Sequence, residues 1–241
     1  MSALVFVHGF MGGSSQWTSQ LPLSDRRELV MLDLPGFGLH SLQPALSSIE
    51  EYGSWVLREL SDLGHTQFDL LGHSMGGMIA QEIVRQSPAR VKRLILYGTG
   101  PVGVLPGRFE PIDVSIARAE ADGPQATARR ISATWFLHGE AASGYPACAR
   151  LAECASLSAQ VAGLRAMKGW NGQEALHSIN HPTLLIWGDQ DRTYQWSQVQ
   201  ALWQGISNSQ LAVVPGCAHA VHMEWPSLFN RIVDGFLTST L

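Results

Sequence analysis

One serine stands where a nucleophile would be exposed at the end of a buried strand. The segment Phe68–Gly77, FDLLGHSMGG, runs from apolar residues into a G-x-S-x-G turn centred on Ser74, and a helix over 77–85 follows. Side chains two positions away would clash in so sharp a turn, which explains glycine at 72 and 76. The turn raises the hydroxyl above the sheet, beside the N–H groups of the helix. The pattern predicts a nucleophile; the alternative is a glycine-rich turn in which Ser74 caps the helix.

Two later segments supply the groups that a serine nucleophile needs. A serine hydroxyl requires a base to take its proton, usually histidine, and a carboxylate to hold that imidazole in the right tautomer. After the fifth apolar run come Asp189 and Asp191, and after the sixth come His219 and His222. Serine, aspartate and histidine follow one another in the order that this kind of sheet requires. Spacing alone leaves both aspartates and both histidines open.

Other polar residues at strand ends are interpreted as braces. His8 ends the first apolar run, and we expect its ring to bond backbone groups of the loop that follows. Asp33 is expected to hold the adjacent loop. His73 precedes the serine, so its side chain should pack under the turn. Cys217 is expected to be a small buried filler.

The elements that must position these residues are six apolar runs with helical patterns between them. The runs are continuously apolar rather than alternating, which indicates strands covered on both faces, as in a parallel sheet. Strands and helices alternate along the chain, which predicts a doubly wound α/β fold with its site at the carboxyl ends of the strands. The expected strands are 3–7, 29–32, 68–71, 93–97, 182–187 and 210–214.

The segment 101–179 has a different pattern. Prolines punctuate short helical stretches rich in alanine and arginine, and no apolar run of the buried-strand type occurs. We interpret it as a helical cap over the strand ends, inserted into a core domain formed by 1–100 and 180–241; ordinary crossover helices are the alternative. The expected cap helices are 116–121, 126–137, 147–164 and 174–179.

Composition excludes several classes of protein. The chain has 241 residues, 45% of them apolar, which suits one large domain with an insertion. Its net charge of −4 and lack of basic runs argue against a nucleic-acid partner. No apolar run is long enough to span a membrane. Three cysteines without a C-x-x-C pair suit a reducing compartment, so we expect a cytoplasmic protein. No phosphate-binding loop or cluster of metal ligands appears, so neither a cofactor nor a metal is expected.

Five motifs, in order, resemble the α/β-hydrolase superfamily with an inserted cap: HGFMGG, DLPGFG, GHSMGG, LLIWGDQD and GCAHAVHMEWP. The resemblance covers nearly the whole chain outside the cap. It implies an α/β-hydrolase fold, a mostly parallel sheet flanked by helices. It also implies that Asp191, the last aspartate of G-x-x-D, is the acid and that His219 is the base. Glu224 and Pro226 fit the glutamate-proline element that follows such a histidine.

The tetrahedral intermediate of acyl transfer needs two N–H donors. One is the backbone N–H of Met75, the residue after the nucleophile, and the resemblance puts the other on Phe10. In this family one or two strands usually precede the strand that ends in HGF, where this sequence has only two residues. We therefore expect a sheet of about six strands with an edge that must be covered or paired, and a homodimer through that edge is conceivable.

The expected function is a serine hydrolase that cleaves a carboxylic ester or lactone of a small molecule through Ser74, His219 and Asp191. Serine at position 74 argues against epoxide hydrolases and haloalkane dehalogenases, which would carry aspartate there. Ala220, where carbon–carbon hydrolases often have tryptophan, argues against that activity without excluding it. A lyase or acyl-transfer enzyme on the same residues, and a non-enzymatic ligand receptor, are further alternatives. Expected pocket residues are Trp17, Trp135, Phe136 and Met223.

Overall fold

A computed structural model of the chain describes residues 2–104 and 107–239. Six parallel strands form one sheet in the order β2-β1-β3-β4-β5-β6. The strands are β1 (Ala3–Val7), β2 (Leu29–Met31), β3 (Phe68–His73), β4 (Val91–Tyr97), β5 (Thr183–Gly188) and β6 (Ser209–Val214). All six lie on the predicted apolar runs, and the α/β-hydrolase architecture that the motifs imply is the one observed.

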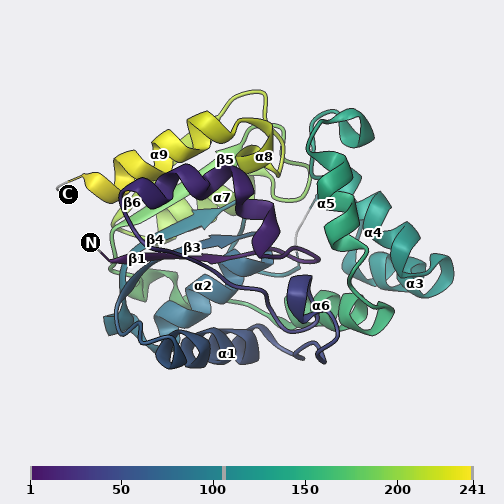
Figure 1. Cartoon of the computed structure of the whole chain (residues 1–241), viewed down its shortest axis with the longest axis horizontal. Coiled ribbons are helices and arrows are strands. Elements are labelled where there is room, and N and C mark those ends of the chain that lie inside the picture. Colours follow the sequence, from purple (N-terminus) through teal and green to yellow (C-terminus); the bar gives the residue numbers. More distant parts are fainter. Residues whose placement is uncertain (1, 105–106, 240–241) are drawn as a thin grey trace.

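Helices cover both faces of the sheet (Figure 1). One face carries α1 (Ile49–Asp62), α2 (Met75–Gln86) and α7 (Trp196–Gly205), and the other carries the 3-10 segment η1 (Ser14–Asp25) and α9 (Pro226–Thr238). Successive strand residues point to opposite faces, so Val5 belongs to the apolar cluster on one face and Phe6 to the cluster on the other. The remaining short elements are η2 (Gly38–His40), η3 (Pro88–Arg90), η4 (Gly139–Ala141), η5 (Gln173–Ser178) and α8 (Val221–Glu224).

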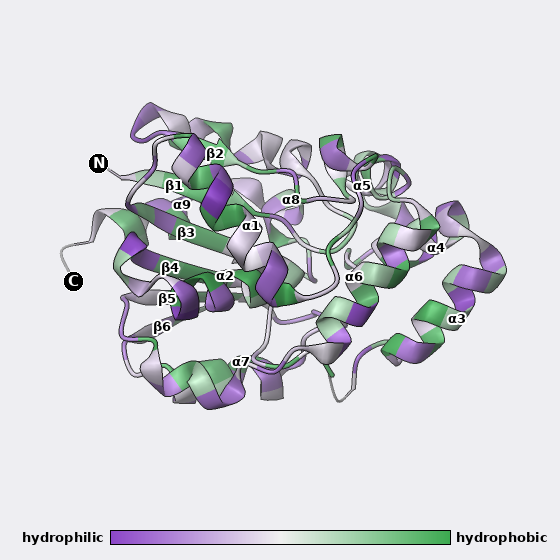
Figure 2. Ribbon diagram, turned by 90° about the horizontal axis from the view of Figure 1, so that it is seen from below, coloured by the Kyte–Doolittle hydropathy of each residue, from purple (hydrophilic) through white to green (hydrophobic). Residues whose placement is uncertain are grey.

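Four helices extend beyond the carboxyl ends of the strands (Figure 1). They are α3 (Ile112–Asp122), α4 (Pro124–Ala133), α5 (Tyr145–Ala152) and α6 (Leu157–Gly169). Figure 2 shows hydrophobic residues in the central strands and a mixture of residue types along these four helices. Their buried residues, among them Ile131 and Met167, join the same apolar cluster as Met78 of α2. The four helices therefore share the core of the sheet.

Two sequence-based predictions of helices are wrong in detail. The stretch 147–164 was expected to be one helix, but the chain breaks between α5 and α6, where the Ser156 hydroxyl accepts a hydrogen bond from Ala159 N and caps α6. The helix expected over 174–179 is instead the 3-10 segment η5. Within the described ranges no helix is long and apolar enough to cross a membrane.

Candidate active site

Ser74 lies in a strained turn between β3 and α2. Its backbone has φ 57° and ψ −120°, a conformation that residues other than glycine rarely adopt. The turn is held from β4, because Ser74 N donates to Tyr97 O at 3.0 Å and the Thr99 hydroxyl donates to Ser74 O at 2.8 Å. Strain at a position that surrounding contacts determine this firmly is a common property of functional sites.

The flanking glycines allow the turn to pack. A Cβ atom on Gly72 would lie 2.2 Å from Gly76 O, and one on Gly76 would lie 2.2 Å from Val7 O. Both distances are far below van der Waals contact, as the sequence argument predicted. Gly9 brings the loop after β1 equally close, since a Cβ there would lie 2.9 Å from Ser74 Cβ. Three glycines thus let two backbone segments approach the serine.

Asp191 and His219 form a buried pair. His219 Nδ1 lies 2.8 Å from Asp191 Oδ2, and both side chains are almost fully buried. Asp191 Oδ1 accepts two backbone hydrogen bonds, from Thr193 N at 2.7 Å and Tyr194 N at 3.0 Å. Asp189 instead accepts from Gly216 N at 2.8 Å and acts as a turn residue. The carboxylate that contacts His219 is therefore Asp191, as the motif comparison implied.

The loop that carries His219 is tied to both the sheet and the cap. The Tyr97 hydroxyl donates to His219 O at 2.7 Å. Glu224 accepts from Ala218 N with one carboxylate oxygen and from Leu137 N with the other, at 2.7 and 2.6 Å. Ala220 N donates to Trp135 O at 2.9 Å. These bonds make the cap a support for the histidine.

Ser74 and His219 line the same cavity. The hydrogen bond expected between Ser74 Oγ and His219 Nε2 is not formed, however, within the described part of the chain. Catalytic hydrogen bonds of this kind are commonly long in the absence of substrate. His219 is thus held by Asp191 and lines the same cavity as Ser74, without a hydrogen bond to Ser74 among the described residues.

Two backbone N–H groups near Ser74 have no acceptor among the described residues. Among the described residues, neither Phe10 N nor Met75 N donates to another group of the chain. The His8 ring supports their loop by contacting Gly9 O at 2.7 Å and accepting from Leu34 N at 2.9 Å. Burial lowers the pKa of His8 to about 4, so the ring is neutral at pH 7. Asp33 accepts from Ser14 N and Leu39 N, which confirms the predicted bracing roles of both residues.

Two further histidines pack beside His219 without a carboxylate partner. Burial, and then the charge of His219, lower the pKa of His73 well below its ordinary value and that of His222 to about 3. The His73 ring stacks on Tyr97 at 4.4 Å between centroids, under the turn as predicted. His222 Nδ1 lies 3.0 Å from the Tyr97 hydroxyl. Both rings are therefore neutral packing groups of the site.

Two cavities meet at Ser74, and both include Phe10 and Trp135. The histidine-side cavity is otherwise lined by Gly9, Gln16, His73, Cys148, His219, Ala220, His222 and Met223. The arginine-side cavity is otherwise lined by Met78, Gly103, Arg108, Ile112, Ile131, Met167, Thr193 and Tyr194. Ser74 thus lies where a cavity beside His219 and a cavity beside Arg108 meet.

The structure places two of the four expected pocket residues at the cavity wall. Trp135 and Met223 line it. Trp17 does not: it is fully buried in the core, 5.1 Å from Phe6 between ring centroids. Phe136 is also fully buried, in a small cluster behind Cys148. Trp17 and Phe136 lie outside the cavities because their side chains pack into apolar clusters and not beside the serine.

Sequence reasoning missed Arg108 and Tyr194. Tyr194 stacks on His219 with 5.7 Å between ring centroids, and its position three residues after the acid was a usable signal. Arg108 lies in the loop before α3, where nothing in the local pattern indicates a site. Across the described ranges, no group of three His, Cys, Asp or Glu side chains is arranged to hold a metal ion.

Comparison with known proteins agrees with this geometry. The sequence matches the alpha/beta hydrolase family over residues 4–231. It is 30% identical to a putative 2-succinyl-6-hydroxy-2,4-cyclohexadiene-1-carboxylate synthase of Bacillus subtilis, over 98% of this chain and 90% of that protein. It is 26% identical to a pimeloyl-[acyl-carrier protein] methyl ester esterase of Aeromonas hydrophila, over 97% of this chain and 94% of that protein.

A further relative is longer than this chain. The biotin biosynthesis bifunctional protein BioHC of Teredinibacter turnerae is 28% identical over 98% of this chain, which spans 44% of that protein. Among solved structures, the enol-lactonase from Burkholderia xenovorans superimposes with a TM-score of 0.87, covering 99% of this chain and 92% of that one at 20% identity. At that identity the likeness shows a shared fold.

Proposed function

The chain belongs to the alpha/beta hydrolase family, and we propose that it is a serine hydrolase that cleaves a carboxylic ester or lactone of a small molecule. The observation that carries the proposal is the Asp191–His219 pair, which faces the same cavity as the strained Ser74. The 26% identity to a methyl ester esterase over nearly the full length of both proteins supports an ester as substrate.

In the proposed reaction, Ser74 Oγ attacks the carbonyl carbon while His219 Nε2 takes its proton. Asp191 holds the imidazole with Nδ1 protonated, which leaves Nε2 free to act as the base. The oxyanion that develops accepts hydrogen bonds from Phe10 N and Met75 N, two donors without an internal partner among the described residues. His219 then protonates the departing alkoxide, and water hydrolyses the acyl-enzyme by the same steps in reverse.

The test is turnover of p-nitrophenyl acetate and butyrate by the wild type and by Ser74→Ala. We expect saturable hydrolysis that falls at least ~1,000-fold in the variant, since the nucleophile is lost. Ser158→Ala is the matched control, because that hydroxyl is on the surface of α6 and contacts only Ser156. A fluorophosphonate probe should label the wild type and Ser158→Ala but not Ser74→Ala. Undiminished turnover in Ser74→Ala would refute the proposal.

A second candidate is lyase chemistry in which Ser74 acts as a base. It is favoured by the 30% identity to a protein named as a synthase. The two candidates differ in one intermediate. A hydrolase forms an acyl-enzyme, so rapid quenching during turnover of p-nitrophenyl butyrate should give a butyryl mass increment on the peptide that contains Ser74. Absence of any increment during Ser74-dependent turnover would favour the second candidate.

A further inference from the structure

The arginine-side cavity contains an unusual combination of groups. Its wall is formed largely by apolar side chains of α2, α3, α4 and α6, among them Met78, Ile131 and Met167. One permanently charged side chain, Arg108, lines it together with Ser74. No other lysine or arginine lines either of the two cavities among the described residues. A guanidinium in such a position calls for an anion.

Arg108 is held in place but not neutralised. Its Nη1 donates to Glu110 O and, at 3.1 Å, to the Ser115 hydroxyl. The guanidinium carbon lies 4.3 Å from the centroid of the Phe109 ring, which fixes the plane of the group. Its Nε and Nη2 donate to no group of the described part of the chain. Nε and Nη2 of the Arg108 guanidinium are thus available to donate hydrogen bonds to a ligand.

The nearest carboxylate is already occupied. Glu110 Oε1 accepts from the Ser115 hydroxyl at 2.7 Å and from Arg130 at 2.6 Å, and Oε2 accepts from Arg118 at 3.3 Å. Arg108 contacts Glu110 only through the main-chain carbonyl. The three guanidinium groups of Arg108, Arg118 and Arg130 thus lie near two carboxylates, those of Glu110 and Asp122, which leaves one positive charge in excess. Burial lowers the pKa of Arg108; Tyr194 and the charge of Glu110 oppose that shift, and the positive charge of Arg130 adds to it.

Arg108 also lies close to the reacting centre. Ser74, Arg108 and Tyr194 line the same cavity. Burial raises the pKa of Tyr194 to about 12, and the Ser74 side chain and the charge of Arg108 oppose that rise. The backbone beyond Arg108 is tied to the acid loop, where Phe109 N donates to Arg192 O at 3.2 Å. Arg108 thus lines the same cavity as the serine, and most of the other side chains of that cavity are apolar.

We propose that Arg108 binds a carboxylate of the substrate, so that the enzyme cleaves acidic esters in which a short apolar chain separates the carboxylate from the reacting carbonyl. A guanidinium with two free donors matches the bidentate geometry of a carboxylate, and the apolar wall matches the methylene groups between the two ends. The inference rests on the proposed ester hydrolysis for the reaction, but it makes a separate claim about binding.

The kinetic test compares an anionic ester with a neutral one of the same length. The substrates are monomethyl esters of the straight-chain diacids from succinate to pimelate, each paired with the methyl ester of the matching alkanoic acid. We expect the wild type to favour the anionic member at the best chain length. Arg108→Gln should lower the ratio of the two kcat/KM values by about 10- to 100-fold, the range for losing a hydrogen-bonded charge partner. Arg108→Lys should retain part of the preference because it keeps the charge.

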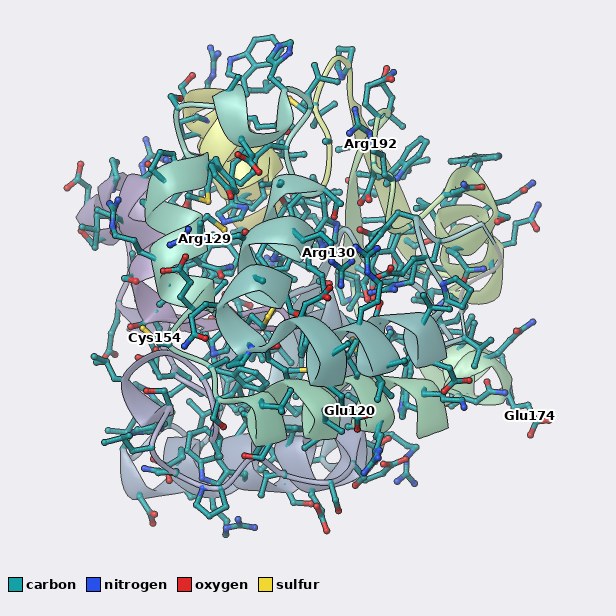
Figure 3. The ribbon with its side chains drawn as sticks, turned by 90° about the vertical axis from the view of Figure 1, so that its right-hand side faces the viewer. Glu120, Arg129, Arg130, Cys154, Glu174 and Arg192 are labelled. Carbon is teal, nitrogen blue, oxygen red and sulfur yellow. The ribbon has the colours of Figure 1, made fainter. Side chains whose placement is uncertain are left out.

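Arg129→Gln is the matched control for a lost positive charge on the cap. Arg129 is the neighbour of Arg130 on α4, but the two side chains extend to different sides of the helix (Figure 3). Arg129 is 64% exposed and pairs with Glu153, away from both cavities. Its substitution should leave the ratio unchanged. Acetyl esters of hydroxy acids carry the carboxylate on the alcohol half of the ester instead of the acyl half. Comparing them with the diacid esters shows which half enters the arginine-side cavity. Arg108→Gln should remove the preference for the anionic substrate in whichever series shows it.

A binding measurement separates failure of this inference from failure of the proposed function. Calorimetry of glutarate with Ser74→Ala requires no turnover, and we expect binding at least about tenfold weaker in Ser74→Ala/Arg108→Gln. If neither ester is hydrolysed but glutarate binds through Arg108, ester hydrolysis fails and the carboxylate site stands. If esters are hydrolysed with no preference for the anionic member, or if Arg108→Gln keeps the preference, the inference is overturned. Labelling of Arg108→Gln by the fluorophosphonate probe shows that the site has folded.

Discussion

Replacement of Asp191 by asparagine isolates the role of the buried pair. The carboxylate has two tasks in the structure: Oδ1 accepts the N–H groups of Thr193 and Tyr194, and Oδ2 accepts His219 Nδ1–H. An asparagine that keeps its oxygen at the Oδ1 position preserves both backbone hydrogen bonds and turns its NH2 group towards His219. The flipped amide would instead leave two buried N–H groups facing a donor, at a cost of about 1–3 kcal/mol for each. The first orientation is therefore the one expected.

That orientation forces the imidazole into the wrong tautomer. Nδ1 must accept from the amide, so the ring proton moves to Nε2, which can no longer take the proton of Ser74. The same change in a serine protease lowers kcat ~10,000-fold, equivalent to about 5.5 kcal/mol in the barrier. We expect a loss of that size for Asp191→Asn. The fold should survive, because both backbone hydrogen bonds of Oδ1 remain.

The assay is kcat with p-nitrophenyl butyrate, normalised to the folded fraction, with thermal unfolding followed by circular dichroism. Asp189→Asn is the matched control, since Asp189 Oδ1 accepts only from Gly216 N and has no contact with His219. We expect it to retain kcat within about threefold. The melting temperature of Asp191→Asn should fall by no more than ~5 °C, the shift that corresponds to one or two kcal/mol in a chain of this size. A kcat for Asp191→Asn above about a tenth of wild type would contradict the assigned role, and so would an equal loss in Asp189→Asn.

Three further predictions test the supports of the site. Gly76→Ala should abolish soluble folded protein or activity, because its Cβ would lie 2.2 Å from Val7 O. Gly235→Ala in α9 is the control, since no atom lies within 4 Å of the added Cβ. Urea titration should show that it stabilises the fold by about 0.5–1 kcal/mol. Glu224→Gln should lower kcat about tenfold and reduce the melting temperature, because one of the two N–H groups that Glu224 accepts would face an amide donor. The free energy of unfolding should fall as the pH drops from about 6.5 to 4. The buried histidines His8, His73 and His222 have lowered pKa values, so they stay neutral in the folded state and take up protons in the unfolded state. Each of them should lower the free energy of unfolding by up to about 1.4 kcal/mol per pH unit. In His222→Gln that slope, measured by denaturant titration at several pH values, should be smaller by one proton; an unchanged slope would contradict the neutral state of this ring.

The sequence predicts the sheet and the serine turn because both are encoded locally. The central strands β1 and β3 are buried along their whole length and are mostly apolar, a pattern that needs no knowledge of the partners. The edge strands β2 and β6 are partly exposed. The turn at Ser74 has no room for a side chain two positions before or after the serine, so glycine is required at 72 and 76 and the motif can be found from the sequence alone. The choice of Asp191 over Asp189 required the family resemblance, because both aspartates follow the same strand and only the fold of the loop decides which one meets His219.

What the sequence does not predict depends on contacts between distant segments. An aromatic residue type suits a core as well as a pocket, so Trp17 was assigned to the pocket although its face packs on Phe6. The alanine-rich run that contains α5 and α6 has a helical pattern throughout. The break is marked only by the Ser156 hydroxyl, which accepts a hydrogen bond from Ala159 N at the start of α6. Arg108 has no local pattern at all. Its place beside Ser74 arises because the loop before α3 folds back over the strand ends.

The turn after Asp191 connects the two functions argued for this site. Asp191 contacts His219, and Tyr194, whose N–H donates to the same carboxylate, lines a cavity together with Ser74 and Arg108. Arg192, between them, accepts from Phe109 N through its carbonyl and donates to Leu137 O, so this turn contacts the helical segment 101–179 at two points. A ligand that pulls on Arg108 therefore acts on the segment that sets the position of His219. Binding at the cation and proton transfer at the serine should then be coupled, so substitutions in 192–194 should change KM and kcat together.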